Sequence, residues 1–371
     1  MSTNIFDIII IGGGISGLGV AREASRSGRR VLLLERGVCG AGTSQGSLRI
    51  MHGGFRYLQQ LNFKRVLESI RAQQELKEAF PEWVKPLPCV MPLARSGLKS
   101  RWPVSMALVL FGFLSRCCGA SAAVGKVLST AEVENELPLI SGQAPHGALL
   151  WWDALLVDHQ KLIRQLMTEV MTRAGTVEEN CRVTAVVRSD GQYQVSAQRE
   201  GGEFQFLAPV VVNTAGAWID SVRPAGAFDN LTPVYWCKAF NVLISRKLTA
   251  MHGVGVHSAE GRLYFTVPRG QGSALGTAYL PLGGDPDSAA VTEVELCGFI
   301  ESFNRAFPQA RVQRSEVLCT EQGVLPTTTP DPLSLKGSAE IRSSGGYVEV
   351  LSTKYTTFLT QARRVLGGVS H

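Results

Sequence analysis

Residues 49–60, with the sequence RIMHGGFRYLQQ, bring together side chains that could oxidise an alcohol. An imidazole has an ordinary pKa of about 6.5, so His52 could accept a hydroxyl proton near neutral pH. Arg56 offers a planar fork of N–H donors for a carboxylate, phosphate or oxyanion, and the Tyr57 hydroxyl could orient a substrate. A histidine beside glycines is more often a turn residue, so this interpretation depends on the elements that position it.

The N-terminal segment predicts a dinucleotide-binding unit. The apolar run 7–11 predicts a buried strand, followed by the pattern G-x-G-x-x-G, a helix through Ser25 and a second strand that ends in Glu35. The glycines allow a tight turn, close approach of a pyrophosphate and close helix–strand contact. The pyrophosphate then lies at the helix N-terminus, while Glu35 stands at the spacing at which an acidic residue binds ribose.

The residues after Glu35 favour FAD over NAD. The segment RGVCGAGTSQGS is small, glycine-rich and hydroxyl-bearing, which suits the second part of a long cofactor, whereas an NAD domain would continue with regular βαβ units. Later, the segments GQYQVSAQ and EFQFLAPVVVNTAGAWID predict a hairpin and then a strand at 209–213 that ends in a second glycine turn. A late strand that returns to the first sheet implies a discontinuous cofactor domain.

Composition excludes several classes of function. The chain has 371 residues, of which 45% are hydrophobic and 18% charged, an ordinary globular composition. The net charge is +6, but the basic residues are scattered, so we expect no nucleic-acid partner and instead an anionic cofactor or substrate. The eight cysteines lack metal-ligand spacing, so we expect free thiols and no metal site.

The most apolar later stretch is VSMALVLFGFL, residues 104–114. As a helix it would span about 16 Å, roughly half the hydrocarbon core of a bilayer, so it could lie on a membrane but not cross one. The N-terminus lacks a basic region before its apolar run and predicts a first strand rather than a targeting peptide. We therefore expect a cytoplasmic protein, with peripheral contact to the inner face of a membrane as an open alternative.

These motifs and their order resemble the FAD-dependent glycerol-3-phosphate dehydrogenases, within the D-amino-acid-oxidase-like (DAO) flavoprotein superfamily. The similarity extends over about residues 5–366 and includes GTSQGSLRIMHGGFRYLQQLNF, LLWWDALLVDHQKL, VVNTAGAWID, EQGVLP and STKYTTF. We expect the family's C-terminal helical extension to be absent, because the sequence ends at His371.

The resemblance implies an α/β fold with two domains. A discontinuous Rossmann-type FAD-binding domain is expected beside a β-sheet-based substrate-binding domain. The FAD-binding domain would comprise residues 1–80, 150–220 and 322–371, and the substrate-binding domain residues 81–149 and 221–321.

The resemblance also assigns catalytic residues. It places His52, Arg56 and Tyr57 on the substrate side of the flavin, where His52 would act as the base that accompanies hydride transfer to flavin N5. Lys354, in the C-terminal turn, would add a cation near the flavin or the substrate. The helix after that turn would aim its N–H groups at the flavin pyrimidine, and Thr356 or Thr357 could cap it.

The residues expected to bind FAD, without a covalent bond, come from the two glycine turns, the end of the second strand, the loop after it, the HGG segment and the C-terminal turn. They are Gly12, Gly14, Ile15, Ser16, Gly17, Glu35, Arg36, Thr43, Ser44, Ser47, Gly53, Gly54, Ala215, Gly216, Trp218, Lys354, Tyr355, Thr356 and Thr357.

One segment departs from the family pattern. The family ordinarily carries an arginine immediately before the proline of EQGVLP, where this sequence has Leu325. Leucine can neither donate a hydrogen bond nor neutralise an anion, and Arg342 is a candidate for a second family arginine. The resemblance therefore implies the fold and the FAD cofactor, but it does not establish glycerol 3-phosphate as the substrate. A sugar, cyclitol or biosynthetic intermediate is at least as good a candidate for the substrate.

Three hypotheses about function follow. The first is an FAD-dependent dehydrogenase or oxidase that acts on a C–OH bond of a small polar substrate, with oxygen, a quinone or a protein open as the electron acceptor. The second is an FAD-dependent amine or amino-acid oxidase, because the same fold serves both chemistries. The third is a flavin-binding protein without turnover, which the presence of His52, Arg56 and Lys354 disfavours.

Overall fold

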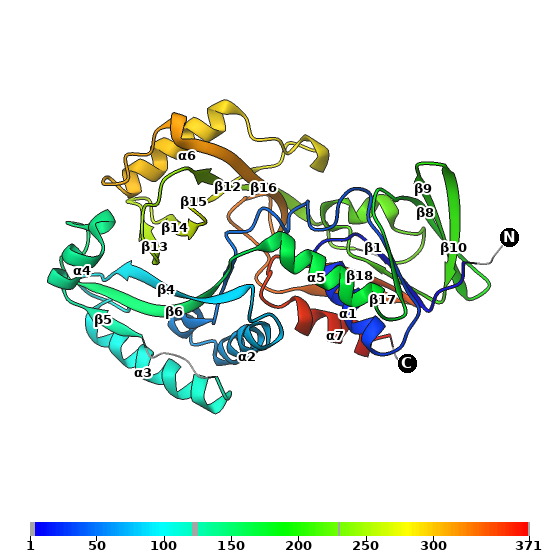
Figure 1. Cartoon of the computed structure of the whole chain (residues 1–371), viewed down its shortest axis with the longest axis horizontal. Coiled ribbons are helices and arrows are strands. Elements are labelled where there is room, and N and C mark those ends of the chain that lie inside the picture. The colour runs from blue at the N-terminus through cyan, green and yellow to red at the C-terminus, as the bar shows by residue number, and fades with distance from the viewer. Residues whose placement is uncertain (1–3, 121–124, 229–230, 370–371) are drawn as a thin grey trace.

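The computed structural model describes residues 4–120, 125–228 and 231–369. The molecule is elongated, with both termini in one half and a large sheet in the other (Figure 1). Within the described residues the strands form three sheets, of six, three and nine strands. The α/β fold class expected from the sequence is confirmed.

The six-stranded sheet has the order β17–β18–β11–β1–β2–β7. Its strands are parallel except β17, which pairs antiparallel with β18. The strands are β1 (Ile8–Ile11), β2 (Val31–Leu34), β7 (Gly175–Glu178), β11 (Val210–Asn213), β17 (Glu340–Ser344) and β18 (Tyr347–Leu351). All residues of β1 and β2 are buried, as a central parallel strand requires.

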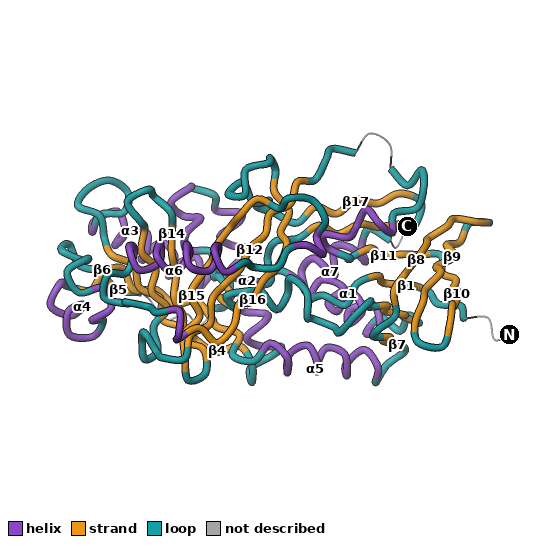
Figure 2. Tube along the Cα trace, turned by 90° about the horizontal axis from the view of Figure 1, so that it is seen from above, coloured by secondary structure: helices purple, strands orange, loops and turns teal. Residues whose placement is uncertain are grey.

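Both faces of this sheet are covered. On one face α1 (Ile15–Arg26) packs against α5 (His159–Met171) and α7 (Phe358–Gly367). On the other face Ile9 and Ile11 share a core with the three-stranded sheet, which contains β8 (Arg182–Ser189), β9 (Gln192–Arg199) and β10 (Gly202–Ala208). In Figure 2 this small sheet lies at the end of the molecule nearest the N-terminus.

The nine-stranded sheet follows the order β16–β12–β15–β14–β13–β4–β6–β3, with β5 paired to β6. Its strands are β3 (Ile50–Met51), β4 (Val84–Pro92), β5 (Lys126–Leu128), β6 (Ala148–Leu156), β12 (Tyr235–Ile244), β13 (Gly253–His257), β14 (Leu263–Arg269), β15 (Gly272–Pro281) and β16 (Val317–Thr327). Helix α6 (Glu293–Ala306) packs Phe299 and Phe303 against this sheet.

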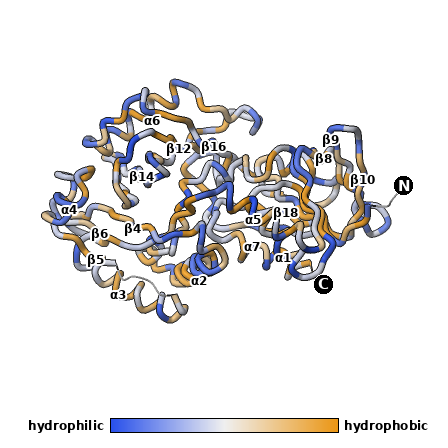
Figure 3. The backbone as a smooth tube through the Cα atoms, viewed as in Figure 1, coloured by the Kyte–Doolittle hydropathy of each residue, from blue (hydrophilic) through white to orange (hydrophobic). Residues whose placement is uncertain are grey.

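The remaining helices are short or lie at the edges. They are α2 (Phe63–Ala79), α3 (Arg101–Cys117), α4 (Thr130–Glu136) and the 3-10 helices η1 (Phe55–Gln60), η2 (Pro138–Ile140), η3 (Gly216–Val222), η4 (Pro286–Ser288) and η5 (Arg314–Glu316). Helix α3 lies on the outer edge of the molecule, and apolar positions recur along it (Figure 3).

The segments 1–80, 150–220 and 322–371, expected to form one domain, contribute strands to all three sheets. Strands β3 and β6, and residues 322–327 of β16, pair within the nine-stranded sheet rather than with β1. These strands connect the two halves and carry residues of the site described next. The division into an FAD-binding and a substrate-binding domain at those boundaries stays a proposal.

Candidate active site

A cavity of about 990 Å³ lies where the six-stranded and nine-stranded sheets meet. Its lining includes Ile11, Leu34 and Leu351, the last residues of β1, β2 and β18. The carboxyl ends of parallel strands are the usual place for a ligand in an open α/β sheet. The opposite wall comes from β6, β12, β14, β15 and β16.

The first glycine turn is shaped by steric limits. Gly12 has a φ of +98°, and a Cβ there would lie 2.7 Å from the Thr214 carbonyl oxygen. A Cβ on Gly17 would lie 2.0 Å from the Gly12 carbonyl oxygen, so the helix can approach the strand only with glycine at this position. A Cβ on Gly14 would meet no atom closer than Ser44 Oγ at 3.3 Å, so Gly14 is less crowded.

Helix α1 begins beside this turn without a side-chain cap. Gly14 is the N-cap residue, and Ser44 Oγ accepts a 2.9 Å hydrogen bond from the Ile15 N–H. Because Gly14, Ile15 and Ser16 all line the cavity, the positive end of the helix dipole faces it. This arrangement fits a pyrophosphate.

Glu35 is held at the end of β2. Its carboxylate accepts hydrogen bonds from the Gly13 N–H at 2.6 Å and the Gly37 N–H at 2.8 Å. Next to it, the Arg36 guanidinium lies 3.8 Å from the centre of the Trp218 ring. The glycine turn, the N-terminus of α1 and this anchored carboxylate together fit the pyrophosphate and ribose of FAD.

The C-terminal turn contributes another wall, through Lys354, Tyr355, Thr356 and Thr357. Helix α7 begins immediately after Thr357, but the Thr357 side chain does not cap it. Instead, the Thr357 hydroxyl oxygen accepts a hydrogen bond from Gln361 Nε2 at 2.5 Å. The expected threonine cap at position 357 is therefore wrong, and the N-terminal end of α7 lies at the cavity without that cap.

His52 is paired with Asp153, a residue that sequence reasoning did not select for the site. Its Nδ1 lies 3.0 Å from Oδ2 of Asp153 in β6, and the His52 side chain is 48% exposed while that of Asp153 is 4% exposed. The other Asp153 oxygen accepts the Gly53 N–H at 2.7 Å. The Trp151 indole N–H donates to Oδ2 at 3.2 Å.

These contacts keep Asp153 ionised. Burial opposes the charged form, but the hydrogen bond and charge of His52 and the Gly53 N–H outweigh it and leave the pKa of Asp153 below its ordinary value. A carboxylate only accepts hydrogen bonds, so Nδ1 of His52 carries a proton, and Nε2 can accept one when the ring is neutral.

Three cations surround Tyr57. The charged ends of Arg56, Arg65 and Lys354 lie 5.3, 5.8 and 4.8 Å from the centre of its ring. Burial raises the pKa of Tyr57, but its contact with Lys354 and the charges of the two arginines outweigh burial, and the net pKa is lowered. All four side chains line the cavity, so this end of the site favours an anionic group.

The structure brings most residues of the predicted site to this one cavity. The exceptions are Gly17, which packs against Gly12, and Gly53, which binds Asp153 through its N–H. The Thr43 hydroxyl is engaged by the backbone of Val324, donating to its oxygen at 3.1 Å and accepting its N–H at 3.0 Å. This contact places the neighbouring Leu325 in the cavity wall.

His159 has a structural role. His159 is buried; its Nε2 donates to the Gly40 carbonyl, and the Tyr355 hydroxyl donates to Nδ1, both at 3.0 Å. Burial lowers the pKa of His159 to about 4, so its ring is neutral. Among the described residues no group of histidines, cysteines and carboxylates could hold a metal ion.

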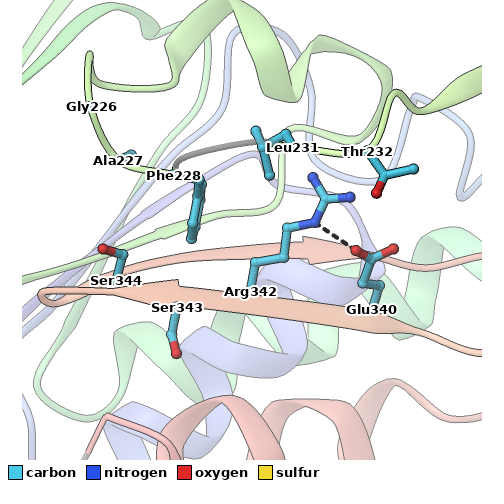
Figure 4. Close-up of a pocket in the computed structure, with 9 residues that line it drawn as sticks. All are labelled: Gly226, Ala227, Phe228, Leu231, Thr232, Glu340, Arg342, Ser343 and Ser344. Carbon is cyan, nitrogen blue, oxygen red and sulfur yellow. Dashed lines mark hydrogen bonds and ion pairs between the residues drawn. The ribbon is translucent and has the colours of Figure 1, made fainter.

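Arg342 does not replace the missing arginine. It lines a separate open pocket of about 490 Å³ beside Phe228 and Ser344, as Figure 4 shows. Its Nε donates to Glu340 at 2.6 Å, and the buried Glu349 lies 3.8 Å from Nη1. Its charge is therefore neutralised away from the large cavity.

Sequence reasoning missed many residues of the cavity wall, among them Arg65, Lys336, Tyr279 and Asp153. Of these, only Asp153 could have been recognised from the sequence, because it is an acidic residue that follows two tryptophans within an otherwise apolar strand. Arg65 stands in an ordinary helix and Lys336 in a loop. Their place at the cavity depends on contacts between distant parts of the chain.

The apolar segment 104–114 forms most of α3. One face of the helix is buried through Val104 and Leu108, whereas Trp102 and Met106 are 81% and 73% exposed. None of the helices formed by the described residues has the length and apolarity needed to span a bilayer.

Comparison with known proteins agrees with this geometry. The model of the family described as DAO, FAD dependent oxidoreductase, matches residues 7–350. Aerobic glycerol-3-phosphate dehydrogenases of Staphylococcus haemolyticus and Staphylococcus aureus are 27% and 26% identical over 97% and 98% of the chain. The chain spans about two thirds of the length of these relatives, 66% and 67%.

Solved structures share the fold. Glycerol-3-phosphate dehydrogenase from Bacillus halodurans, complexed with FAD, superposes with a TM-score of 0.76 at 21% identity over 100% of the chain and 65% of its own length. The L-α-glycerophosphate oxidase of Mycoplasma pneumoniae, with FAD bound, gives 0.73 at 16% identity over 99% and 95%. L-proline dehydrogenase from P. horikoshii gives 0.70 at 16% identity over 99% and 94%.

Proposed function

The chain belongs to the DAO family of FAD-dependent oxidoreductases, and from that premise we propose that it oxidises a C–OH carbon of a polar, hydroxylated substrate. The observation that carries this proposal is the pair formed by His52 and Asp153 at the wall of the FAD cavity. The names of the staphylococcal relatives, which are dehydrogenases of a phosphorylated alcohol, support it.

Alcohol oxidation removes a hydride from carbon and a proton from oxygen. FAD, when bound, supplies the two-electron acceptor for the hydride. His52 accepts the hydroxyl proton at Nε2, because Nδ1 is occupied by its hydrogen bond to Asp153. The proton leaves a cationic imidazolium beside an anionic carboxylate, so the buried Asp153 stabilises the protonated base as the reaction proceeds.

The substrate is held by charge. Arg56, Arg65 and Lys354 surround Tyr57 at the cavity wall, and guanidinium and ammonium groups form strong hydrogen bonds to phosphate, carboxylate or oxyanion. Leu325 contributes no such bond. We therefore propose an acidic or phosphorylated hydroxyl compound as the class of substrate, without committing to glycerol 3-phosphate.

The experiment that tests the proposal is anaerobic bleaching of the flavin by a panel of compounds. Phosphorylated polyols, sugar acids and cyclitols are compared with amino acids and secondary amines, which represent the second hypothesis. Bleaching by a hydroxyl compound supports C–OH oxidation. Bleaching by amines alone would transfer the assignment to an amine or amino-acid oxidase, and no bleaching by any member of either set would favour a flavin-binding protein without turnover.

We also propose that α3 makes a peripheral contact with an anionic membrane surface. Its exposed stripe includes Trp102, Met106 and Phe113. Between Trp83 and Ala131 the chain contains basic but no acidic residues. Exposed apolar side chains flanked by basic ones are typical of helices that lie in the interface of a negatively charged membrane.

A further inference from the structure

The cavity extends well beyond the His52–Asp153 pair. Asp153, Trp151 and Leu149 alternate along β6 and therefore face the same side of the sheet, and all three line the cavity. From Asp153 to Leu149 the strand advances four residues, about 13 Å. The wall changes along this path from a carboxylate to an indole and then to an alkyl side chain.

Neighbouring strands continue this apolar surface. Met91 of β4 pairs opposite Leu149. From β14, Phe265 packs edge-on against Trp151 with ring centres 6.5 Å apart, and Leu263 follows on the same face. We call these five residues, Leu149, Trp151, Met91, Phe265 and Leu263, the apolar arm of the cavity.

Two glycines leave room for the arm. A Cβ on Gly255 would lie 2.6 Å from the Phe265 ring and 3.3 Å from Met91 Cε. A Cβ on Gly253 would lie 2.9 Å from the same ring. Phe265 therefore packs closely against the backbone of β13, at the wall of the cavity.

The arm ends at a pair of basic side chains. His257 pairs opposite Leu263 across β13 and β14, and its Nε2 lies 3.1 Å from Nζ of Lys99. Both side chains line the cavity. Among the described lining residues the acidic ones are Glu35 and Asp153, and both already accept backbone N–H bonds elsewhere in the cavity.

The chemistry of this end selects one class of ligand. Burial and the charge of Lys99 lower the pKa of His257, so the pair holds one ammonium and one neutral ring with no carboxylate to balance the charge. Because an ammonium only donates, Nε2 of His257 accepts from Lys99, and a bound acidic group would accept the remaining hydrogen bonds of the Lys99 ammonium. A neutral amphiphile would bury its apolar chain in the arm, but it would form no charge-assisted hydrogen bond with this pair.

We propose that the apolar arm holds the tail of an elongated substrate that has its hydroxyl carbon at His52 and an acidic group at Lys99 and His257. This inference rests on the proposed C–OH oxidation and adds the shape and polarity of the substrate. A short compound with a polar group only at the His52 end would not reach the apolar arm.

The test uses the FAD-loaded protein and probes that cannot be oxidised. Linear saturated carboxylates of increasing length are titrated while the flavin absorbance spectrum is recorded, with alkyl trimethylammonium ions of the same lengths as the charge-reversed control. Each methylene buried in the arm should tighten binding about fourfold until the chain fills the span of ~13 Å. Equal affinities for all lengths, or for both charges, would overturn the proposal.

Two variants locate the binding. Lys99→Gln should weaken carboxylate binding by up to about fivefold and leave linear alcohols unaffected, whereas Lys247→Gln, an exposed lysine outside the cavity, should change neither. Leu149→Trp should abolish the gain with length. If Lys99→Gln has no effect while a neutral quinone binds more tightly than any carboxylate, the arm is an acceptor channel and the proposal is wrong.

The binding readout separates this inference from the proposed function. Carboxylates that bind with the predicted length dependence, in a protein whose flavin no hydroxyl compound reduces, would support the arm and refute C–OH oxidation. If short polyols reduce the flavin but probe affinity does not depend on probe length, the result would support C–OH oxidation and refute the proposed role of the apolar arm.

Discussion

Nδ1 of His52 lies 3.0 Å from Oδ2 of Asp153, although the two residues are 101 positions apart in the chain. The contact forms because β3, which ends one residue before His52, pairs antiparallel with β6, which carries Asp153. The same carboxylate accepts the Gly53 N–H. One buried acidic group therefore fixes both the tautomer of the histidine and the backbone turn that presents it.

Asp153→Asn should slow flavin reduction. The amide keeps the size of the side chain but cannot balance the charge of a protonated His52, and this change behind a catalytic histidine costs up to about ten-thousandfold in rate. FAD content should stay normal, because Asp153 lies outside the first glycine turn and the N-terminus of α1. Rapid-reaction measurement of flavin reduction tests this, and a rate equal to that of the parent would show that the contact is only structural.

Asp153 should also make stability depend on pH. Its folded pKa is below its ordinary value, so the stabilisation is fully present above the unfolded pKa, about 3.9, and is lost as pH falls through the lower folded value. Urea unfolding midpoints should therefore differ between parent and Asp153→Asn at pH 7 and converge in the acid range below about pH 4. A constant difference across both pH values would contradict this account.

Gly17→Ala should disrupt the first glycine turn. Gly17→Ala places a Cβ 2.0 Å from the Gly12 carbonyl oxygen, and that oxygen belongs to the backbone and cannot move freely. We expect loss of FAD and a lower unfolding temperature. Gly298→Ala, in α6 and outside the cavity, is the control, because its Cβ would meet no atom within 4 Å. Flavin-to-protein ratios after purification distinguish the two, and equal FAD content would refute the steric argument.

The sequence predicts the cofactor half of the site better than the substrate half. Gly12, Gly17 and Glu35 are local, because one strand, one turn and one helix fix their geometry. Asp153 and Arg65 could not be placed beforehand, since their positions depend on how β6 and α2 dock against segments far away in the chain. The prediction that Arg342 replaces the missing arginine was wrong for the same reason. The partner Glu340 lies on the same strand as Arg342, but the pocket that Arg342 lines also includes Gly226, which is far away in the chain.

Leu325→Arg should favour phosphorylated substrates. Leu325 lines the cavity, and an arginine there would add a charge-assisted hydrogen bond, worth roughly tenfold or more in affinity. Glycerol 3-phosphate should then perturb or reduce the flavin at lower concentration than in the parent. Leu318→Arg, at an exposed position of the same strand, is the control. Equal responses of the two variants would show that Leu325 does not face the substrate.

Membrane contact through α3 should depend on both apolar and charged groups. The parent should sediment with vesicles that contain phosphatidylserine and less with neutral vesicles, and added salt should weaken the association. Replacing exposed Trp102 and Phe113 by serine should abolish sedimentation without unfolding, since neither side chain is in the core. Val294→Ser, an exposed apolar position on α6, should have no effect. Complete recovery of the parent in the supernatant would exclude the contact.

The central claim is that His52 takes the substrate proton while Glu35 serves only the cofactor. Glu35→Ala should lose FAD more readily and reduce it at a near-normal rate once FAD is saturating. His52→Ala should retain normal FAD content and lose about a hundredfold to ten-thousandfold in the rate of flavin reduction. The decisive measurement is anaerobic stopped-flow reduction of the His52→Ala flavin by a substrate that the bleaching panel identifies. A rate reduced by that factor is the predicted result, and reduction as fast as in the parent would contradict the account.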